Sequence, residues 1–195
     1  MKKIGLIFGS FNPIHKGHLF IGQTVLNRKL VDSVRYIVAK QNPFKDEYSV
    51  CFDDRMLMTT LAMAYSRYLG YDMMSDAIES IANTTRTFDT LEAIKKAYGE
   101  DNEYVIICGD DMYEQIPQWY KGEEILKQYK FVVFSREFNY TITYNENIIE
   151  YITIRGNEIY SSTNVRKCIK EESDMLSTLL PESVEKYIKS RGFYV

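Results

Sequence analysis

Short apolar runs alternate with helix-like patterns along this chain, and that alternation limits its fold more than any other feature. The first run, Ile4–Phe8, is almost continuously apolar and stops at Gly9. Such a run is typical of a strand that is buried on both faces of a parallel sheet. After the next loop, apolar residues return at helical spacing at Leu19, Ile21, Val25 and Leu26. The chain therefore begins with a predicted strand, a loop and a helix.

The same order recurs along the rest of the sequence. Further strands are predicted over residues 33–39, 71–77, 103–108, 130–134 and 151–154, the last of them in an irregular, β-rich segment. Helical spacing is found at residues 57–64 and 91–98, and two closing helices are expected to begin at Ser162 and Pro181. This alternation predicts an α/β fold with a doubly wound parallel sheet. The 195 residues, 45% of them hydrophobic, are expected to form a single domain over residues 1–195.

Charge and cysteine content argue against several classes of protein. A net charge of −3 argues against general binding to nucleic acid polymers, although it is compatible with a local basic pocket. The three cysteines (Cys51, Cys108, Cys168) are scattered, which fits neither a disulfide framework nor a CxxC metal pair. No stretch approaches the roughly 18 apolar residues of a membrane span, and the first run is too short for a signal peptide. We expect a cytoplasmic protein that binds neither nucleic acid nor membrane, and we leave open whether it forms a homo-oligomer.

The loop after the first predicted strand, GSFNPIHKGHL, holds both histidines of the chain, His15 and His18. Gly9 and Gly17 allow the backbone to approach a ligand, and the start of the next helix attracts anions. A zinc site would need about three or four ligands, and neither a third histidine nor a cysteine pair exists to complete one. Two interpretations remain, histidines that cap the helix or lie on the surface, and imidazoles that donate hydrogen bonds to phosphate. The presence of both histidines in one glycine-bracketed loop favours phosphate.

A second group of polar residues, Tyr160–Lys167, precedes a helical pattern near the other end of the sequence. The ordinary interpretation of Ser161, Ser162 and Thr163 is that they cap this helix. The same hydroxyls, together with the planar guanidinium of Arg166 one turn later, also suit a polyphosphate. In that case two helix N-termini would meet one anionic ligand.

These two motifs together resemble those of the nucleotidyltransferase superfamily, which carries HxGH near its amino end and SST-x-(I/V)-R near its carboxyl end. Here they are His15–His18 and Ser161–Arg166. More of the chain is similar to bacterial nicotinate mononucleotide adenylyltransferases. The similar segments are Arg86–Leu91 (YT-x-DTL in the family), Cys108–Met112 (the G-x-D block), Ile116–Tyr120 (the PxWY block), Arg136 after the fifth strand, and the closing helix after Leu180-Pro181.

The resemblance implies a Rossmann-like nucleotidyltransferase fold and a reaction in which nicotinate mononucleotide and ATP, with Mg²⁺, give nicotinate adenine dinucleotide and pyrophosphate. It implies His15, His18 and Arg166 as catalytic residues. It implies that ATP is bound by Gly9, Ser10, Phe11, His15, Gly17, His18, Gly109, Asp111, Ser161, Ser162, Thr163 and Arg166. It implies that the mononucleotide is bound by Ser10, Asn12, Lys45, Thr87, Trp119, Tyr120 and Arg136.

Several residues depart from the family pattern. Asn12 replaces an aspartate, Phe44 a histidine, Arg86 a tyrosine and Glu137 a proline. Asn12 keeps a hydrogen-bonding side chain but loses a charge. Phe44 cannot donate a hydrogen bond, and Arg86 stands close to the presumed pyridine carboxylate, where it could favour the acid substrate or simply face the solvent.

The sequence leaves open the roles of three residues and the exact activity of the chain. Lys45 could be an ordinary solvated lysine, Asp111 a helix N-cap, and Trp119 a core aromatic. The chain could be a related adenylyltransferase that uses nicotinamide mononucleotide or another phosphate acceptor. It could also be a nucleotide-binding module without catalytic activity. In every case we expect the partners to be small nucleotides, with ATP and a pyridine mononucleotide first.

Overall fold

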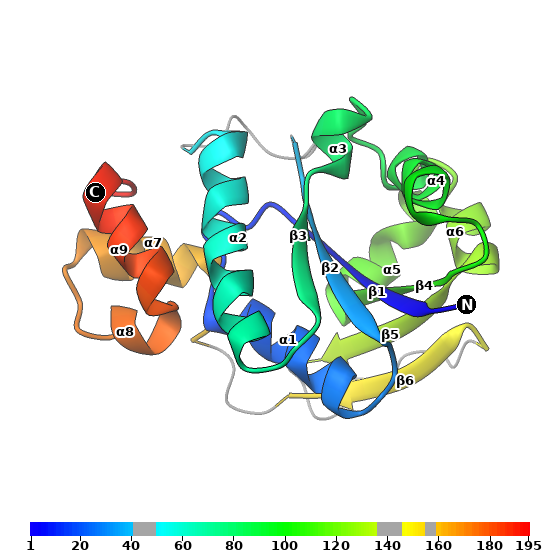
Figure 1. Cartoon of the computed structure of the whole chain (residues 1–195), viewed down its shortest axis with the longest axis horizontal. Coiled ribbons are helices and arrows are strands. Elements are labelled where there is room, and N and C mark those ends of the chain that lie inside the picture. Colours follow the sequence, from blue (N-terminus) through cyan, green and yellow to red (C-terminus); the bar gives the residue numbers. More distant parts are fainter. Residues whose placement is uncertain (41–49, 136–145, 155–158) are drawn as a thin grey trace.

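The computed structural model describes residues 1–40, 50–135, 146–154 and 159–195. A six-stranded parallel sheet forms its centre, in the strand order β3-β2-β1-β4-β5-β6 (Figure 1). The order reverses between the neighbours β1 and β4, which confirms the predicted doubly wound α/β fold. The strands are β1 (Lys3–Gly9), β2 (Ser33–Val38), β3 (Met73–Asp76), β4 (Glu103–Gly109), β5 (Lys130–Ser135) and β6 (Ile148–Thr153).

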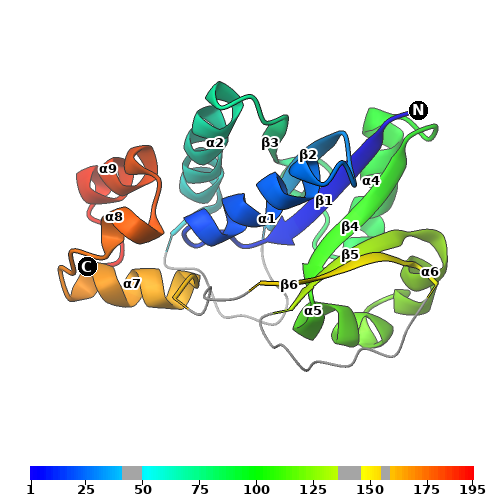
Figure 2. The same cartoon turned by 90° about the horizontal axis from the view of Figure 1, so that it is seen from below.

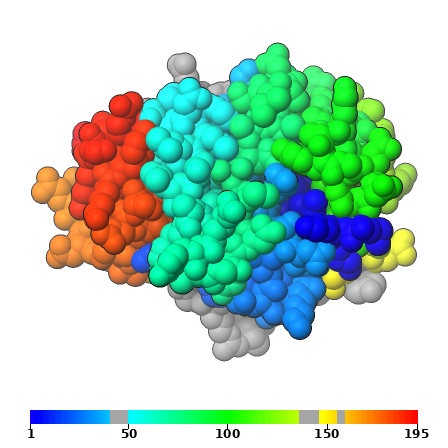
Figure 3. Space-filling view, in the orientation of Figure 1, coloured from blue at the N-terminus to red at the C-terminus, as the bar shows by residue number. Residues whose placement is uncertain are grey.

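Helices cover both faces of the sheet (Figures 1 and 2). One face packs against α1 (Lys16–Asn27) and α2 (Phe52–Tyr68), and the other against α4 (Thr87–Tyr98), α5 (Asp110–Gln115) and α6 (Gly122–Gln128). Three helices, α7 (Ser162–Lys170), α8 (Leu176–Leu179) and α9 (Glu182–Arg191), gather beside α1 and α2. Figure 3 shows the last of them, in red, packed directly against α2, in cyan. Two short segments, α3 (Ile78–Ile81) and the 3-10 helix η1 (Ile116–Gln118), complete the fold.

Two hydrophobic cores explain why the central strands read as continuous apolar runs. Alternate residues of one strand enter opposite cores, as Ile106 and Ile107 of β4 do. In β2, Tyr36 lies in the core beneath α1 and α2, whereas Ile37 lies in the core beneath α4. Burial on both faces makes most positions of such strands apolar, with Ser33 and Arg35 of β2 as exceptions. This is the physical basis of the pattern from which the sheet was predicted.

The element boundaries differ from the predictions in places. The weak strand expected over residues 71–77 shortens to Met73–Asp76, and the last strand begins earlier, at Ile148. The closing helix begins at Glu182, so that Pro181 is its N-cap rather than its first residue. Four short helices were not predicted (α3, α5, α6 and α8), because four to seven residues contain too few turns to show a helical period. None of the helices in the described ranges is both long and apolar enough to cross a membrane.

Candidate active site

The loop that leaves β1 is held in place by buried apolar side chains. Phe11 adopts a left-handed backbone conformation (φ 45°), and its side chain is almost fully buried. Its ring packs edge-on against His18, with 5.1 Å between ring centroids, and lies tilted against the ring of Tyr36 at 5.7 Å. Ile14 is completely buried in the same loop. The two anchors give a segment rich in turn formers one defined path, which ends at the first turn of α1.

The two histidines stack on each other at the N-terminus of α1. Their ring centroids lie 3.7 Å apart with an angle of 25° between the planes, and His15 is 4% exposed. The backbone N–H of His15 donates to Nδ1 of His18 (3.2 Å). A neutral His18 with an acceptor at Nδ1 carries its hydrogen on Nε2, so its other ring nitrogen is a donor. One such donor is what an interaction with a phosphate oxygen requires.

The buried Tyr36 supports this turn from beneath. Its hydroxyl donates to the backbone carbonyl of His18 (2.9 Å). Burial raises the pKa of Tyr36 far above its ordinary value, so the hydroxyl remains a protonated donor. The first turn of α1 is therefore tied to the middle of the sheet.

Close packing at this turn accounts for Gly17. A Cβ atom at this position would lie 2.6 Å from Cβ of Tyr160, which precedes α7, and 3.0 Å from Nδ1 of His15. Contact at 2.6 Å is shorter than carbon atoms tolerate, so any side chain would push the two segments apart. The glycine between the histidines thus allows the segment before α7 to lie against the start of α1.

The second predicted motif forms the start of α7, as its capping residues indicated. Ser161 is the N-cap, and its hydroxyl accepts a hydrogen bond from the N–H of Asn164 (3.0 Å). The ordinary interpretation is therefore correct for Ser161. The neighbouring hydroxyls of Ser162 and Thr163 are not used in this way.

The fold joins the two motifs directly, although about 150 residues separate them. The hydroxyl of Ser162 donates to the carbonyl of Pro13 (2.9 Å). One guanidinium nitrogen of Arg166 donates to the carbonyl of Asn12 (2.7 Å), and another to the hydroxyl of Thr163 (3.1 Å). The expected meeting of two helix N-termini is thus present in the structure, while the binding of a triphosphate by these residues stays a prediction.

Further support for the loop comes from Arg55 in α2, which the sequence analysis missed. The side chain is 1% exposed, and its guanidinium donates to four backbone carbonyls, those of Ser10, Ala39, Lys40 and Val50. Ser10 belongs to the loop after β1, and Ala39 and Lys40 follow β2. An arginine within a helical pattern gives no signal of such a role, because its partners are backbone atoms of other segments.

A buried carboxyl group lies next to this arginine. Glu79 of α3 is 5% exposed and accepts hydrogen bonds from the N–H of Lys40 (3.0 Å) and the hydroxyl of Thr90 (3.4 Å). Burial raises its pKa to about 7, although these bonds and the charge of Arg55 act in the opposite direction. Glu79 thus connects the end of β2 to α4.

Of the residues predicted to bind the mononucleotide, Ser10 and Asn12 lie in the loop after β1, whereas Thr87, Trp119 and Tyr120 lie on the other helical layer. Thr87 is the first residue of α4, and Trp119 is half-buried against the core beneath that helix. The exposed Tyr120 contacts the same region, because the guanidinium of Arg86 lies 4.5 Å from its ring centroid and the ring of Phe88 packs edge-on against it. The structure therefore brings the RTFDTL and PxWY segments together. Lys45 and Arg136, with Phe44 and Glu137, lie outside the described residues.

The third predicted segment follows β4. Gly109 ends that strand and is the N-cap of α5, and β4 is the parallel neighbour of β1, so both strands end at the same edge of the sheet. Asp111 is exposed, and its carboxylate accepts a hydrogen bond from the N–H of Met112 (2.8 Å). This is a local bond at the helix start, so the proposed contact between Asp111 and a ribose stays a prediction.

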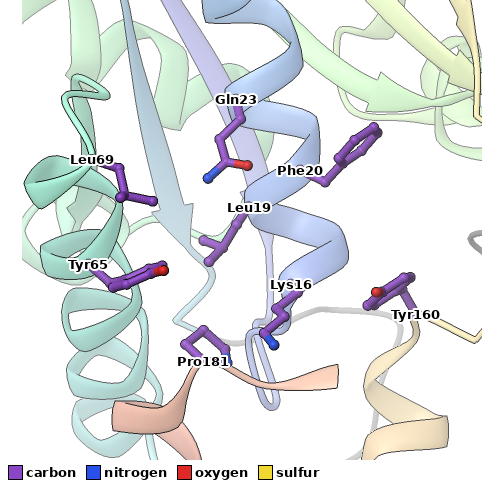
Figure 4. Close-up of a pocket in the computed structure, with 8 residues that line it drawn as sticks. All are labelled: Lys16, Leu19, Phe20, Gln23, Tyr65, Leu69, Tyr160 and Pro181. Carbon is purple, nitrogen blue, oxygen red and sulfur yellow. The ribbon is translucent and has the colours of Figure 1, made fainter. Parts of the chain in front are cut away.

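A hollow of about 360 Å³ lies beside the candidate site, between α1 and α2 (Figure 4). The ammonium group of Lys16, at its edge, donates to the carbonyl of Ser177 (2.6 Å). His15, His18, Ser162 and Arg166 do not line the hollow, but Lys16 and Tyr160 do, so it adjoins the place where the two motifs meet. Its lining is Lys16, Leu19, Phe20, Gln23, Tyr65, Leu69, Tyr160 and Pro181.

Comparison with known proteins agrees with this arrangement. A sequence model of the cytidylyltransferase-like family matches residues 6–168. A probable nicotinate-nucleotide adenylyltransferase from Cytophaga hutchinsonii is 36% identical over 98% of each chain, and one from Caldicellulosiruptor bescii is 34% identical over 98% of each. Among solved structures, a Plasmodium falciparum nicotinic acid mononucleotide adenylyltransferase complexed with NaAD has a TM-score of 0.79 at 21% identity, covering 100% of this chain and 98% of that one. The same Plasmodium enzyme complexed with APC has a TM-score of 0.77.

Family membership follows from these matches. The two bacterial relatives share more than a third of their residues with this chain over nearly their full length. The two motifs of this chain meet in one place in the structure. The chain belongs to the nicotinate-nucleotide adenylyltransferase family.

Proposed function

We propose that this protein transfers the adenylyl group of ATP to nicotinate mononucleotide and releases pyrophosphate, as a step of NAD biosynthesis. The relatives that carry this name support the choice of substrate. The observation that carries the proposal is the junction of the two motifs, where Ser162 and Arg166 of α7 bond the loop that bears His15 and His18. We include a cytoplasmic location, which the three scattered cysteines support.

The chemistry needs no protein nucleophile. A phosphate oxygen of the mononucleotide attacks the α-phosphorus of ATP, a new P–O bond forms, and the bond to the bridging oxygen of the β-phosphate breaks. The electron pair of that bond leaves with pyrophosphate. The protein contributes by aligning the two phosphates and by neutralising the charge that grows on the departing group.

The groups at the junction suit that task because they are hydrogen-bond donors. His18 presents a donor at Nε2, Arg166 supplies a positive charge, and the hydroxyl of Thr163 accepts from Arg166 and keeps its own hydrogen to donate. The hydrogen of Ser162 is donated to Pro13, so this hydroxyl would bond a phosphate by exchanging that partner. We assign the triphosphate to these groups and to the backbone around Gly9 and Gly17. The glycines let the main chain approach the phosphates, and the start of α1 adds a partial positive charge.

Mg²⁺ belongs to this proposal as part of the substrate. Among residues 1–40, 50–135, 146–154 and 159–195, no three histidine, cysteine or acidic side chains gather to hold a metal ion. The side chains at the junction are donors, which fit phosphate oxygens rather than a cation. Mg²⁺ prefers oxygen ligands and keeps several waters, so it would enter bound to the phosphates of ATP.

The pyridine nucleotide would lie between α4 and the segment after α5. Thr87 and Trp119 stand at this place in the structure, with the positive charge of Arg86 beside Tyr120. We assign the ring to Trp119 and the nicotinate carboxylate to Thr87 and its neighbours. The side chain of Arg86 is exposed, as the alternative interpretation expected, and from there its positive charge would favour a carboxylate over a neutral amide.

A substrate panel tests this assignment. Pyrophosphate release is measured with MgATP and, in turn, nicotinate mononucleotide, nicotinamide mononucleotide, phosphopantetheine or no acceptor. We expect rapid release only with a pyridine mononucleotide, and kcat/KM at least about 10-fold higher for the nicotinate form, the discrimination that a hydrogen-bonded, charged group in a site supports. Preference for phosphopantetheine would refute the substrate, and ATP binding without turnover of any acceptor would identify a non-catalytic nucleotide-binding module.

A further inference from the structure

The hydroxyl of Tyr194 reaches the phosphate-side loop from the far end of the sequence. It donates to Oδ1 of Asn12 across a distance of 2.6 Å, and 182 positions separate the two residues. Tyr194 is 9% exposed and Asn12 is 8% exposed, so the bond is shielded from water. A buried donor that loses its partner has no water to replace it, which makes this bond costly to break.

Two arginines hold the same loop as this hydroxyl. Arg166 donates to the carbonyl of Asn12, and Arg55 donates to the carbonyl of Ser10. Burial raises the pKa of Tyr194, while the charges of Arg166 and Arg55 act to lower it, as expected for a hydroxyl close to both guanidinium groups. At neutral pH it is a protonated donor, held at the point where α2, α7 and the loop after β1 meet.

The backbone around this tyrosine is adapted to place its ring. Tyr194 has a left-handed conformation (φ 66°), which is unfavourable for a residue other than glycine. The ring belongs to the core between α1, α2 and α7 and packs against Phe193, with 6.2 Å between centroids. Such a conformation persists only where the contacts of the side chain offset its cost, and here those contacts are the core and Asn12.

The bond also determines which way the amide of Asn12 faces. With Oδ1 turned to the hydroxyl, the NH₂ group of the amide is on the opposite side. The carbonyl of the same residue is occupied by Arg166. Both acceptors of Asn12 thus face protein donors. These two bonds hold Asn12 in place three residues before His15.

We propose that Tyr194 is a positioning residue for adenylyl transfer, which orients Asn12 and thereby the loop that carries His15 and His18. This inference rests on the proposed function for its effect on turnover, and on the structure alone for its effect on the loop. A misplacement of reacting groups by about 1 Å can slow a reaction by up to about 100-fold. Loss of the hydroxyl should therefore act on kcat more than on substrate binding.

The test compares Tyr194→Phe with a matched control, Tyr187→Phe. Tyr187 lies in α9, and its hydroxyl donates to Asp54 of α2 (2.5 Å) rather than to the loop after β1. Both changes remove one hydroxyl from a hydrogen bond near the same end of the sequence. Pyrophosphate release with MgATP and nicotinate mononucleotide gives kcat and KM for each variant, and the thermal midpoint of each is measured in parallel.

We expect kcat of Tyr194→Phe to fall about 10-fold with less than about a 3-fold change in KM for ATP, and that of Tyr187→Phe to stay within about 2-fold of wild type. In a double-mutant cycle, Asn12→Ala with Tyr194→Phe should be no slower than Asn12→Ala alone, since the two groups act through one bond. Unchanged kcat in Tyr194→Phe, or additive effects in the cycle, would overturn the proposal.

A second measurement is independent of the substrate. Hydrogen–deuterium exchange of peptides that cover residues 9–18 should be about 10-fold faster in Tyr194→Phe than in wild type and unchanged in Tyr187→Phe. If exchange in this loop is unaltered, the hydroxyl does not hold it. Faster exchange in a protein that fails to turn over nicotinate mononucleotide would show that Tyr194 holds the loop and would refute the proposed function.

Discussion

The buried carboxyl of Glu79 makes stability depend on pH in an unusual direction. Burial raises its pKa from the ordinary 4.5 to about 7. Between these values the folded protein keeps a proton that the unfolded chain has released. The free energy of unfolding therefore falls as pH rises through this window, opposite to the effect of a carboxylate that is stabilised in its charged form.

The size of this effect follows from the shift in pKa. One pKa unit corresponds to about 1.36 kcal/mol. A shift from 4.5 to about 7 makes the Glu79 contribution about 2.5 kcal/mol larger at pH 5 than at pH 8, by proton linkage. Lys40 donates to one carboxyl oxygen of Glu79 and Thr90 to the other, so Glu79→Gln keeps an acceptor for one of the two bonds and removes the titration. From pH 5 to pH 8, the free energy of unfolding of the variant should therefore rise by about that amount relative to that of wild type.

Urea unfolding followed by circular dichroism at pH 5, 6, 7 and 8 measures the difference. Glu123→Gln, at an exposed position of α6, controls for the loss of one negative charge. The quantity of interest is the change with pH in the stability difference between variant and wild type, because any constant cost of the substitution cancels. A difference between Glu79→Gln and wild type that stays within about 0.5 kcal/mol from pH 5 to pH 8 would refute the reasoning.

Two further predictions concern the loop after β1. His18→Ala should lower kcat by about 100-fold or more and change ATP affinity much less, because a donor to the reacting phosphates acts mainly in the transition state. Steady-state kinetics and an ATP-binding titration measure the two effects. An unchanged rate would remove His18 from the mechanism. Arg55→Met should lower the free energy of unfolding by about 3 kcal/mol or more, since it leaves four backbone carbonyls without their donor. A loss below about 1 kcal/mol in urea unfolding would show that these carbonyls find other partners.

The structure shows the contacts of Asn12, at the position where the resemblance implies an aspartate. Its amide oxygen accepts the hydroxyl of Tyr194, and its backbone carbonyl accepts Arg166. An aspartate could accept the same hydroxyl, so the change from acid to amide preserves this bond. It alters the charge of the loop and leaves an NH₂ group where an aspartate would have a second oxygen.

Much of the fold could be predicted from local pattern. Strands such as Glu103–Gly109 pack on both faces, so their hydrophobic runs are visible in the sequence, and the order of strands and helices then restricts the topology to a doubly wound sheet. The capping role of Ser161 was equally visible, because a cap acts on its own helix. Short helices and strand ends were less predictable, because a few residues do not establish a period.

Part of the candidate site could likewise be predicted from sequence, and part could not. The types of residue at the phosphate loop and at the start of α7 indicated phosphate chemistry and, by resemblance, adenylyl transfer, because that chemistry needs particular donors at particular spacings. The bonds from Ser162 and Arg166 to the loop, the four carbonyls around Arg55, and the buried pair of Tyr194 and Asn12 gave no such signal. Each joins residues that are distant in sequence, and several end on backbone atoms, which every residue has. Such contacts follow from how helices pack on the sheet, so they emerge only once the chain is folded.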